Sequence, residues 1–383
     1  MKKLKYAVIG AGIIGCQHAG VAAKLEEYEL VAVADIVEEK AKSLAEEFNI
    51  RAYTNYIEML EKEELDVVSI CTPHPTHAEV AIEAMKRGVN VLTEKPMAAT
   101  VNQCQAMIKE SRKRGVKLGV VFQYRFEPRY RKARALISAG ELGDVYRGLL
   151  RYVTYRDMAY FASAAWRGKW HTEGGGVLIN QAVHFVDLFL WMVGKRATEV
   201  FAFAGTLGHE IEVEDLVSSA VLFEGGCQGV IQCSTLDYPD MINIEVRGDR
   251  GMLLVETSPK NVEGGLRNET RVYLYRNSPP IRRVIFSSLK PGYRRLGCEI
   301  EEITEEPSST RSSHEAVLRD FAKAVLEDRE PEVPGEEGMK SVELVNAIIL
   351  SAAEHTTVKL PLEPARYDAL LSKLTNLRSP PWD

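Results

Sequence analysis

The sequence predicts an α/β protein of two domains, in which a doubly wound parallel sheet is followed by an α+β domain with an open, mainly antiparallel sheet. Three observations support this fold class. The chain has 383 residues, more than a single hydrophobic core usually organises. Its first third alternates short apolar runs with segments of helical period. Its middle carries long runs of alternating polar and apolar residues. We therefore expect domains at 1–124 and 125–383, with C-terminal helices that can pack back on the first domain.

Short, nearly continuous apolar runs are typical of strands buried on both faces of a parallel sheet. The expected strands of the first domain are 4–9, 30–34, 51–53, 67–70, 90–92 and 118–121. The expected helices are 13–25, 37–48, 56–61, 77–86 and 101–114. Thr76 and Thr100 are the expected N-caps, and Gly88 and Gly115 stand where helices should end.

The second domain is expected to begin with a helix at 128–138. Alternating stretches predict strands at 145–155, 198–204, 216–223, 229–235, 242–247 and 252–256, with hairpin turns at 224–226 and 248–251. A long helix is expected at 178–193 and two more at 315–327 and 338–355. The polar stretch 277–313 reads as a loop.

The composition favours small-molecule chemistry. A formal net charge of -6 includes no basic excess that would attract nucleic acid or an anionic membrane surface. No apolar run approaches the length needed to span a bilayer. The cysteines form no C-x-x-C pair, which indicates free thiols in a reducing cytoplasm; they are Cys16, Cys71, Cys104, Cys227, Cys233 and Cys298.

A glycine-rich turn follows the first predicted strand, in the order Gly10-Ala11-Gly12-Ile13-Ile14-Gly15. Gly10 permits a tight turn, Gly12 lets the backbone approach a pyrophosphate, and Gly15 lets the helix pack closely on the sheet. Asp35 ends the second strand, where a carboxylate binds a ribose 2′-hydroxyl and repels a 2′-phosphate. Because no arginine follows Asp35, the pattern predicts NAD rather than NADP.

Two loops at the expected carboxyl edge of the sheet carry polar residues. Thr72, Pro73 and His77 follow the fourth strand, and His77 is as well explained by a helix-start role as by contact with the dinucleotide. Glu94 and Lys95 follow the fifth strand, beside Pro96. A lysine at this edge can stabilise the alkoxide character that develops when a hydride leaves carbon.

Three glycines, Gly174 to Gly176, lead into a predicted helix on which Asn180, His184 and Asp187 share one face. A polar stripe on an otherwise apolar helix must find partners, which a pocket would supply. His184 is the expected general base, because imidazole titrates near neutral pH. No second histidine lies at ligand spacing, so no metal is expected.

These motifs resemble the glucose-fructose oxidoreductase and inositol dehydrogenase family, often called Gfo/Idh/MocA. The resemblance rests on the glycine turn, Thr72-Pro73 with His77, Glu94-Lys95-Pro96, Trp166-Arg167, the triple glycine with His184 and Asp187, and the tail from Asp320-Phe321 to Val358-Lys359-Leu360-Pro361. It implies a Rossmann domain, a sheet domain that often forms dimers or tetramers, and oxidation of a sugar or cyclitol hydroxyl with NAD(P). It also suggests a cis peptide bond between Lys95 and Pro96. Asn180 departs from the family pattern, which commonly has aspartate there, and an amide cannot accept a proton.

The resemblance implies catalytic roles for Lys95 and His184, with Asn180 orienting the substrate hydroxyl. The expected cofactor site comprises Gly10, Gly12, Ile13, Ile14, Gly15, Asp35, Thr72, Pro73, His77, Glu94, Lys95, Gln123, Trp166 and Arg167. The expected substrate site comprises Lys95, Gln123, Arg125, Tyr155, Trp166, Asn180 and His184. A homodimer or homotetramer is expected through the C-terminal sheet, with Val217, Val221 and Val230 on its half-apolar open face.

Two other functions are compatible with the same motifs. One is a glycoside hydrolase that retains NAD and cleaves by transient oxidation and elimination. The other is a non-catalytic NAD-binding regulatory protein, against which the presence of both Lys95 and His184 argues.

Overall fold

The computed structural model describes residues 3–262, 265–285, 297–304, 310–377 and 382. The chain forms two compact units. The first takes residues up to 126, 171–174 and 308–343, and the second takes 127–170, 175–307 and those from 344 onward. The division after residue 124 stays a prediction of where independently folding domains meet.

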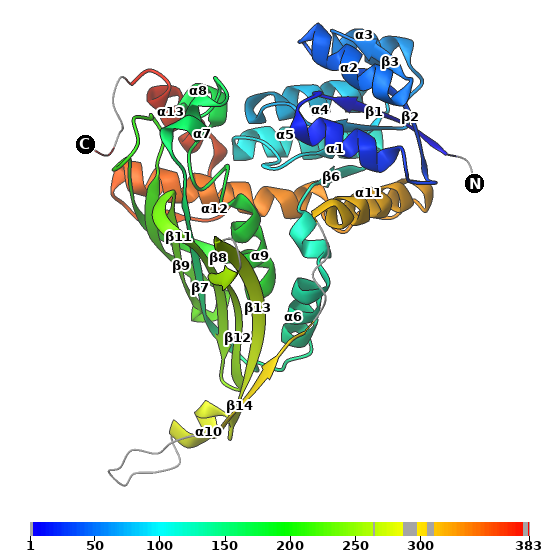
Figure 1. Cartoon of the computed structure of the whole chain (residues 1–383). Helices are drawn as coiled ribbons and strands as arrows, with labels where there is room; N and C mark the ends of the chain where they lie inside the picture. The colour runs from blue at the N-terminus through cyan, green and yellow to red at the C-terminus, as the bar shows by residue number, and fades with distance from the viewer. Residues whose placement is uncertain (1–2, 263–264, 286–296, 305–309, 378–381, 383) are drawn as a thin grey trace. The chain divides into compact units, whose positions relative to one another are not determined.

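The first unit is built on a six-stranded parallel sheet, which confirms the predicted doubly wound fold (Figure 1). Its strands are β1 (Leu4–Ile9), β2 (Tyr28–Ala34), β3 (Arg51–Tyr53), β4 (Val67–Ile70), β5 (Asn90–Thr93) and β6 (Leu118–Val120). The spatial order is β3-β2-β1-β4-β5-β6. The order reverses between β1 and β4, and ligands of such sheets bind outside the carboxyl ends of the strands at this point.

The helices of the first unit lie close to their predicted positions. They are α1 (Ile13–Ala22), α2 (Glu38–Phe48), α3 (Tyr56–Lys62), α4 (His77–Lys86) and α5 (Val101–Arg114), with short 3-10 turns η1 (His74–Thr76) and η2 (Gln123–Phe126). Thr100 caps α5 in a capping box with Gln103, as predicted. The prediction that Thr76 caps α4 is wrong, because η1 already holds Thr76 in a helical conformation rather than the extended one that a cap needs.

Helix α11 (Thr310–Leu326) completes the core of the first unit (Figure 1). Its Leu318 and Phe321 are buried in the same cluster as Tyr6 and Val8 of β1. The Tyr28 hydroxyl donates to the Leu318 carbonyl oxygen at 2.9 Å. The following helix α12 (Gly335–Glu354) begins in this unit and continues into the second. The Rossmann core is therefore assembled from both ends of the chain.

The second unit contains a nine-stranded sheet in which, among the pairs described, only β7 and β10 run parallel. The strands are β7 (Val145–Tyr155), β8 (Ala197–Gly205), β9 (Leu216–Phe223), β10 (Gln228–Ser234), β11 (Leu236–Gly248), β12 (Gly251–Val262), β13 (Gly265–Ser278), β14 (Gly297–Glu302) and β15 (Val358–Lys359). Their order is β14-β13-β12-β11-β7-β10-β9-β8-β15, which confirms the predicted mainly antiparallel sheet.

Two parts of this unit differ from the prediction. The predicted loop 277–313 contains α10 (Ile281–Ile285) and edge strand β14, whose residues are all exposed and half of which are glutamates, so no apolar alternation marked it. The segments 286–296 and 305–309 lie outside the described residues. Helix α9 (Val183–Val193) begins five residues later than the predicted helix 178–193, because residues 178–182 form tight turns.

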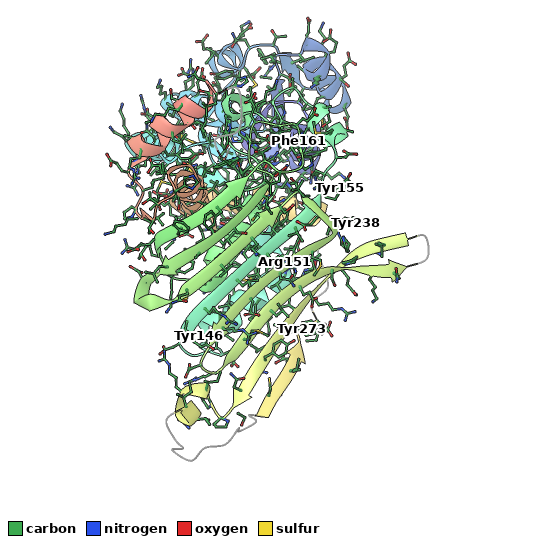
Figure 2. All side chains as sticks on the ribbon, turned by 90° about the vertical axis from the view of Figure 1, so that its left-hand side faces the viewer. Tyr146, Arg151, Tyr155, Phe161, Tyr238 and Tyr273 are labelled. Atoms are coloured by element: carbon green, nitrogen blue, oxygen red, sulfur yellow. The ribbon has the colours of Figure 1, made fainter. Side chains whose placement is uncertain are left out.

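Helices α6 (Pro128–Ser138) and α9 lie on one side of the sheet, and Figure 2 shows its opposite, open face. A Cβ atom on Gly148 of β7 would lie 2.7 Å from the Phe189 ring, which shows how closely α9 packs. Val217 and Val221 point toward this covered side and are buried, so their predicted place on the open face is wrong. The open face instead carries Val230, as predicted, together with Leu222 and Phe203.

The smaller helices of the second unit are α7 (Met158–Ala162) and α13 (Pro364–Leu374), and α8 (Trp170–Glu173) spans the boundary between the units.

Candidate active site

The three glycines of the turn after β1 differ in whether a side chain would fit at their positions. Gly10 has a φ of 99°, and a Cβ atom there would lie 2.6 Å from the Cys71 carbonyl oxygen. A Cβ atom on Gly15 would lie 1.8 Å from the Gly10 carbonyl oxygen. At Gly12 nothing lies within 4 Å of the same position. Gly10 and Gly15 are thus needed for the turn itself, whereas Gly12 leaves room for a ligand.

Asp35 stands at the carboxyl end of β2 and binds the glycine turn. Its Oδ2 atom accepts a hydrogen bond from the Ala11 N–H at 2.7 Å, and its Oδ1 atom accepts one from the Val37 N–H at 2.8 Å. Ile13 and Ile36 are 89% and 91% exposed beside it. Helix α1 begins at Ile13 without a side-chain cap. Open helix amides, a carboxylate for the ribose and exposed apolar residues for the adenine fit a dinucleotide.

His77 ties together the loops that follow β4 and β5. Its Nε2 lies 2.7 Å from the Thr72 carbonyl oxygen, and its Nδ1 lies 2.8 Å from the Pro96 carbonyl oxygen. Burial lowers the pKa of this histidine, and the two backbone hydrogen bonds oppose that shift. Both ring nitrogens thus lie against main-chain oxygens of these two loops, and a neutral ring donates its one proton to either of them. The ring therefore has a structural task at the start of α4.

Lys95 follows β5 at the same edge of the sheet, and its peptide bond to Pro96 is cis, as predicted. Its N–H donates to the Glu94 Oε2 at 3.1 Å. Burial lowers the pKa of His74 well below its ordinary value, and the positive charge of Lys95 lowers it further. A neutral His74 ring and the cation of Lys95 thus stand at the carboxyl edge.

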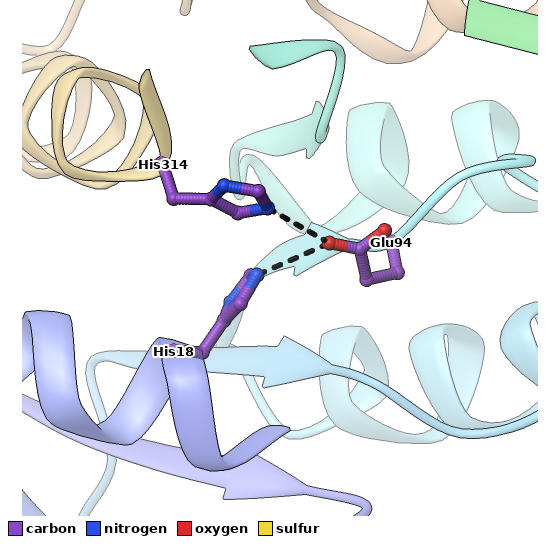
Figure 3. Close-up of side chains that lie close together, drawn as sticks. All are labelled: His18, Glu94 and His314. Carbon is purple, nitrogen blue, oxygen red and sulfur yellow. Dashed lines mark hydrogen bonds and ion pairs between the residues drawn. The ribbon is translucent and has the colours of Figure 1, made fainter. Parts of the chain in front are cut away.

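Glu94 is buried between two histidines that come from distant parts of the sequence (Figure 3). Its Oε1 lies 3.2 Å from the His18 Nε2 and 3.9 Å from the His314 Nε2. Burial alone would raise the pKa of Glu94, but the hydrogen bond from His18 and the electrostatic interactions with His18, His314 and Lys95 lower it to about 2. The carboxylate is therefore ionised at neutral pH.

Gln123 and Arg125 lie in η2 and are both buried. The Oε1 atom of Gln123 has no hydrogen-bond partner within the described part of the chain. The guanidinium of Arg125 is 3.3 Å from the Glu337 carboxylate of α12. Gln123 consequently keeps an acceptor for a ligand, while Arg125 is held within the unit.

In the second unit, a buried carboxylate holds the glycine segment. Glu214 is fully buried and accepts hydrogen bonds from the Gly176 N–H at 2.9 Å and the Leu178 N–H at 3.2 Å. A Cβ atom on Gly176 would lie 2.0 Å from the Glu214 carbonyl oxygen. Gly176 is needed for this close approach, which fixes the start of the segment that carries Asn180 and His184.

Asn180 does not share a helix face with His184 and Asp187, contrary to the prediction. It lies in the turns before α9 and is 7% exposed, while His184 is half-buried in the first turn of the helix and Asp187 is buried. The run of apolar residues from 177 to 179 suggested helix, but hydrogen bonds to Glu214 draw this backbone into turns instead.

Three N–H donors converge on the hydroxyl oxygen of Tyr160 in α7. They come from Gln181 at 3.1 Å, from Asn180 at 3.4 Å and from Arg167. The Arg167 guanidinium also lies 4.1 Å from the Tyr160 ring centre and 4.7 Å from that of Trp166. The Nε atom of Arg167 and the Oε1 atom of Gln181 are buried without a partner among the described residues. Trp166, Arg167 and Asn180 are thus brought together around a tyrosine.

Tyr155 stands apart from this group at the end of β7. Its side chain is 51% exposed, and its ring centre lies 6.5 Å from that of Tyr238 on the open face of the sheet (Figure 2).

Sequence reasoning missed four residues of these clusters: His18, Tyr160, Glu214 and His314. His18 had a local signal, since it lies one turn after Gly15 on α1. The other three have no pattern of their own, because their partners are far away in the sequence or belong to loops. Within the described residues, no helix has the length and apolar character of a membrane span.

Comparisons with known proteins match both units. Residues 4–122 match the oxidoreductase family described by its NAD-binding Rossmann fold, and residues 130–254 match the GFO/IDH/MocA C-terminal domain. Myo-inositol 2-dehydrogenase of Thermotoga maritima is 28% identical over 93% of this chain and 98% of its own length. The NAD(+)-dependent scyllo-inositol 2-dehydrogenase of Bacillus subtilis is 27% identical over 67% of this chain and 74% of its own length.

A solved structure extends the likeness to nearly the whole chain. The WlbA dehydrogenase of Bordetella pertussis, in complex with NADH and UDP-GlcNAcA, is 27% identical and has a TM-score of 0.78. The match covers 94% of this chain and 100% of that structure.

Proposed function

Because the chain belongs to the Gfo/Idh/MocA family of NAD-dependent oxidoreductases, we propose that it moves a hydride between NAD and a secondary hydroxyl carbon of a sugar, cyclitol or sugar derivative. The relatives named above act on inositols or are bound to a nucleotide sugar acid. One observation carries the proposal. The turn that fits a dinucleotide follows β1 and the cation of Lys95 follows β5, two strands of one parallel sheet that are separated only by β4, so both lie at its carboxyl edge.

We assign the cofactor to the first unit. The amides at the start of α1 would face the pyrophosphate, and Asp35 would accept from the adenosine ribose. NAD, when bound, supplies the carbon that accepts or donates the hydride. Glu94 keeps the main chain at Lys95 in place, and the open space at Gly12 admits the phosphates.

We assign the proton chemistry to Lys95 and His184. The Lys95 ammonium would donate a hydrogen bond to the substrate oxygen and stabilise its negative charge as the hydride leaves. His184 would take the hydroxyl proton, since imidazole is the side chain suited to this transfer near neutral pH. Asn180 would orient the hydroxyl, and Gln123, with its unpaired buried Oε1, would accept from another hydroxyl of the substrate.

A panel of sugars, cyclitols and sugar acids with NAD, followed by the absorbance of the reduced nicotinamide, tests this function. Lys95→Met and His184→Asn should each lower kcat on the best substrate by about two orders of magnitude, with little change in NAD affinity. Lys109→Met and His355→Asn, at exposed positions, are the matched controls and should keep full activity. Turnover of a glycoside without accumulation of reduced nicotinamide would instead indicate the hydrolase.

We further propose that the protein is a cytoplasmic homo-oligomer joined through the open face of its sheet. The cysteines of the described residues are free thiols, as suits a reducing compartment. The open face exposes Phe203, Leu222 and Val230 on neighbouring strands, beside Arg147 and Glu245, which pair at 3.2 Å. An exposed apolar patch with a polar rim suits a second copy of the same chain. Val230→Glu should dissociate the oligomer in light scattering, whereas a monomeric parent protein would refute the interface.

A further inference from the structure

Glu94 belongs to a buried cluster of side chains from four segments of the first unit, in which Ser69 contacts His18 and both histidines face Glu94. His18 comes from α1, His314 from α11, Ser69 from β4, and the carboxylate itself follows β5. His18 is fully buried, His314 is 2% exposed and Glu94 is 8% exposed. A buried carboxylate is unfavourable unless it accepts hydrogen bonds or faces positive charge. The cluster supplies such partners on both sides of Glu94.

The contacts on the far side of each ring fix where its proton lies. The Gln17 Nε2 donates to the His314 Nδ1 at 3.1 Å, so the ring proton of His314 is on Nε2 and faces Glu94. The Tyr6 hydroxyl donates to the Ser69 Oγ, which leaves the serine proton for the His18 Nδ1 at 3.0 Å. His18 then also carries its proton on Nε2, toward the same carboxylate oxygen. The two rings thus present N–H groups to Glu94.

The second carboxylate oxygen faces the main chain of Lys95. Glu94 Oε2 accepts from the Lys95 N–H at 3.1 Å, while the Glu94 N–H donates to the Ile70 carbonyl oxygen at 2.9 Å. One side chain therefore bridges the histidine pair and the main chain of Lys95. The charge of Lys95 also contributes to the ionised state of Glu94.

We propose that His18 and His314 are positioning residues that act through Glu94 to hold Lys95 in its reactive orientation. The proposal rests on the proposed function, in which Lys95 stabilises the substrate oxygen. Neither histidine needs to touch substrate or cofactor. The histidine pair fixes the carboxylate, the carboxylate fixes the peptide before Lys95, and a small displacement of a reacting group is costly in rate.

Substitutions at His314 separate the contribution of its Nε2–H group, which lies 3.9 Å from the Glu94 Oε1, from that of the bulk of the ring. His314→Leu keeps an apolar volume but removes the donor, whereas His314→Gln can place an N–H near the position of Nε2. We expect His314→Leu to lower kcat at least about tenfold with KM and NAD affinity nearly unchanged, and His314→Gln to restore most of the loss. His355→Gln, at an exposed position, is the control and should behave as the parent. Equal losses in the Leu and Gln variants would overturn the donor role.

A double-mutant cycle with Lys95→Met tests whether the effect passes through Lys95. If it does, His314→Leu should cost no further activity in the Lys95→Met protein, because the group that it positions is already gone. Additive losses would show a general structural role and overturn the proposal. Stoichiometric zinc or manganese in the purified protein that is lost in His314→Leu would also overturn it, since the rings would then be metal ligands.

Hydrogen exchange gives a readout that does not depend on turnover. A peptide covering residues 93–98 should exchange faster in His314→Leu than in the parent, while a peptide from β4 should be unchanged. If no substrate of the panel is oxidised, the proposed function fails. The exchange rate of the Lys95 amide then still tests whether His314 and Glu94 hold the main chain of Lys95 in place. Unchanged exchange in that peptide would refute it.

Discussion

The carboxylate of Asp35 accepts a hydrogen bond from the main-chain N–H of Ala11 at 2.7 Å, so the residue that we propose to select the cofactor also braces the glycine turn. The same side chain caps the loop after β2 through the Val37 N–H. The proposed selection of the cofactor and the shape of the glycine turn therefore depend on one side chain.

We predict that NAD binds more tightly than NADP and that Asp35→Ser narrows the difference. The substitution removes the charge that repels a 2′-phosphate and shortens the acceptor that reaches the ribose. Calorimetric titration with both cofactors measures the ratio, with Glu39→Ser, an exposed carboxylate on α2, as the control. Equal affinities in the parent protein would contradict this role of Asp35.

Gly12 and Gly15 should respond differently to alanine. The Cβ atom of Gly12→Ala enters open space, so Tm should hardly change while NAD binding weakens strongly. The Cβ atom of Gly15→Ala would lie 1.8 Å from a main-chain oxygen, which should prevent correct folding. Thermal unfolding and NAD titration of both variants check the contrast, and unimpaired NAD binding by Gly12→Ala would count against the phosphate site.

Tyr160→Phe should destabilise the protein and lower its activity together. The substitution removes the oxygen on which Arg167, Asn180 and Gln181 converge, and leaving buried donors unpaired costs about 1–3 kcal/mol. Urea unfolding and steady-state kinetics measure the two effects. Tyr146→Phe, whose ring is 39% exposed, is the matched control. A Tyr160→Phe protein with the stability and kcat/KM of the parent would show that the three donors do not depend on this oxygen.

The stability that Glu94 provides should depend on pH in the acid range. Its pKa is about 2 in the folded protein and 4.5 for an ordinary glutamate, so this contribution is full above about pH 4.5 and is lost as the pH falls toward 2. A shift of this size corresponds to about 3 kcal/mol. The groups that face it are His18, His314 and Lys95.

The stability difference between the parent and Glu94→Gln should therefore shrink as the pH is lowered from about 5 to about 3, measured by urea unfolding. Glu39→Gln, on the exposed surface of α2, should show no such trend relative to the parent. A difference that stays constant over this range would contradict the buried, ionised state of Glu94.

Most of the first unit could be predicted from sequence because its signals are local. Strands such as β1 and β4 are continuous apolar runs, and the capping box at Thr100 lies within four residues. The same locality placed Lys95 and the glycine turn correctly at the carboxyl edge. The predictions that proved wrong concern residues whose conformation depends on distant partners. Asn180 was predicted to lie in a helix, but Glu214, far along the chain, holds the preceding backbone in turns, and no local pattern indicates this contact.

In the second unit, too, the local pattern did not show which face of the sheet would be covered. Alternation identified β9 correctly, but it could not say which of the two faces is covered, and Val217 and Val221 proved to be on the buried side. Strand β14 was missed because an exposed, charged edge strand needs no apolar side.

Because α11 completes the core of the first unit, the parallel sheet of that unit cannot be fully covered until late in synthesis. The strands of the first unit leave the ribosome early, yet Leu318, Phe321 and His314, which complete its core and enclose Glu94, follow only after eight of the nine strands of the second unit's sheet. Domains usually fold as they emerge, N-terminal first. Here the half-made Rossmann sheet must wait with part of its apolar surface uncovered, so a chaperone that binds nascent chains would find its target in this interval. The first unit is thus the first to be started, yet its core is closed only after most of the second unit's sheet has been made.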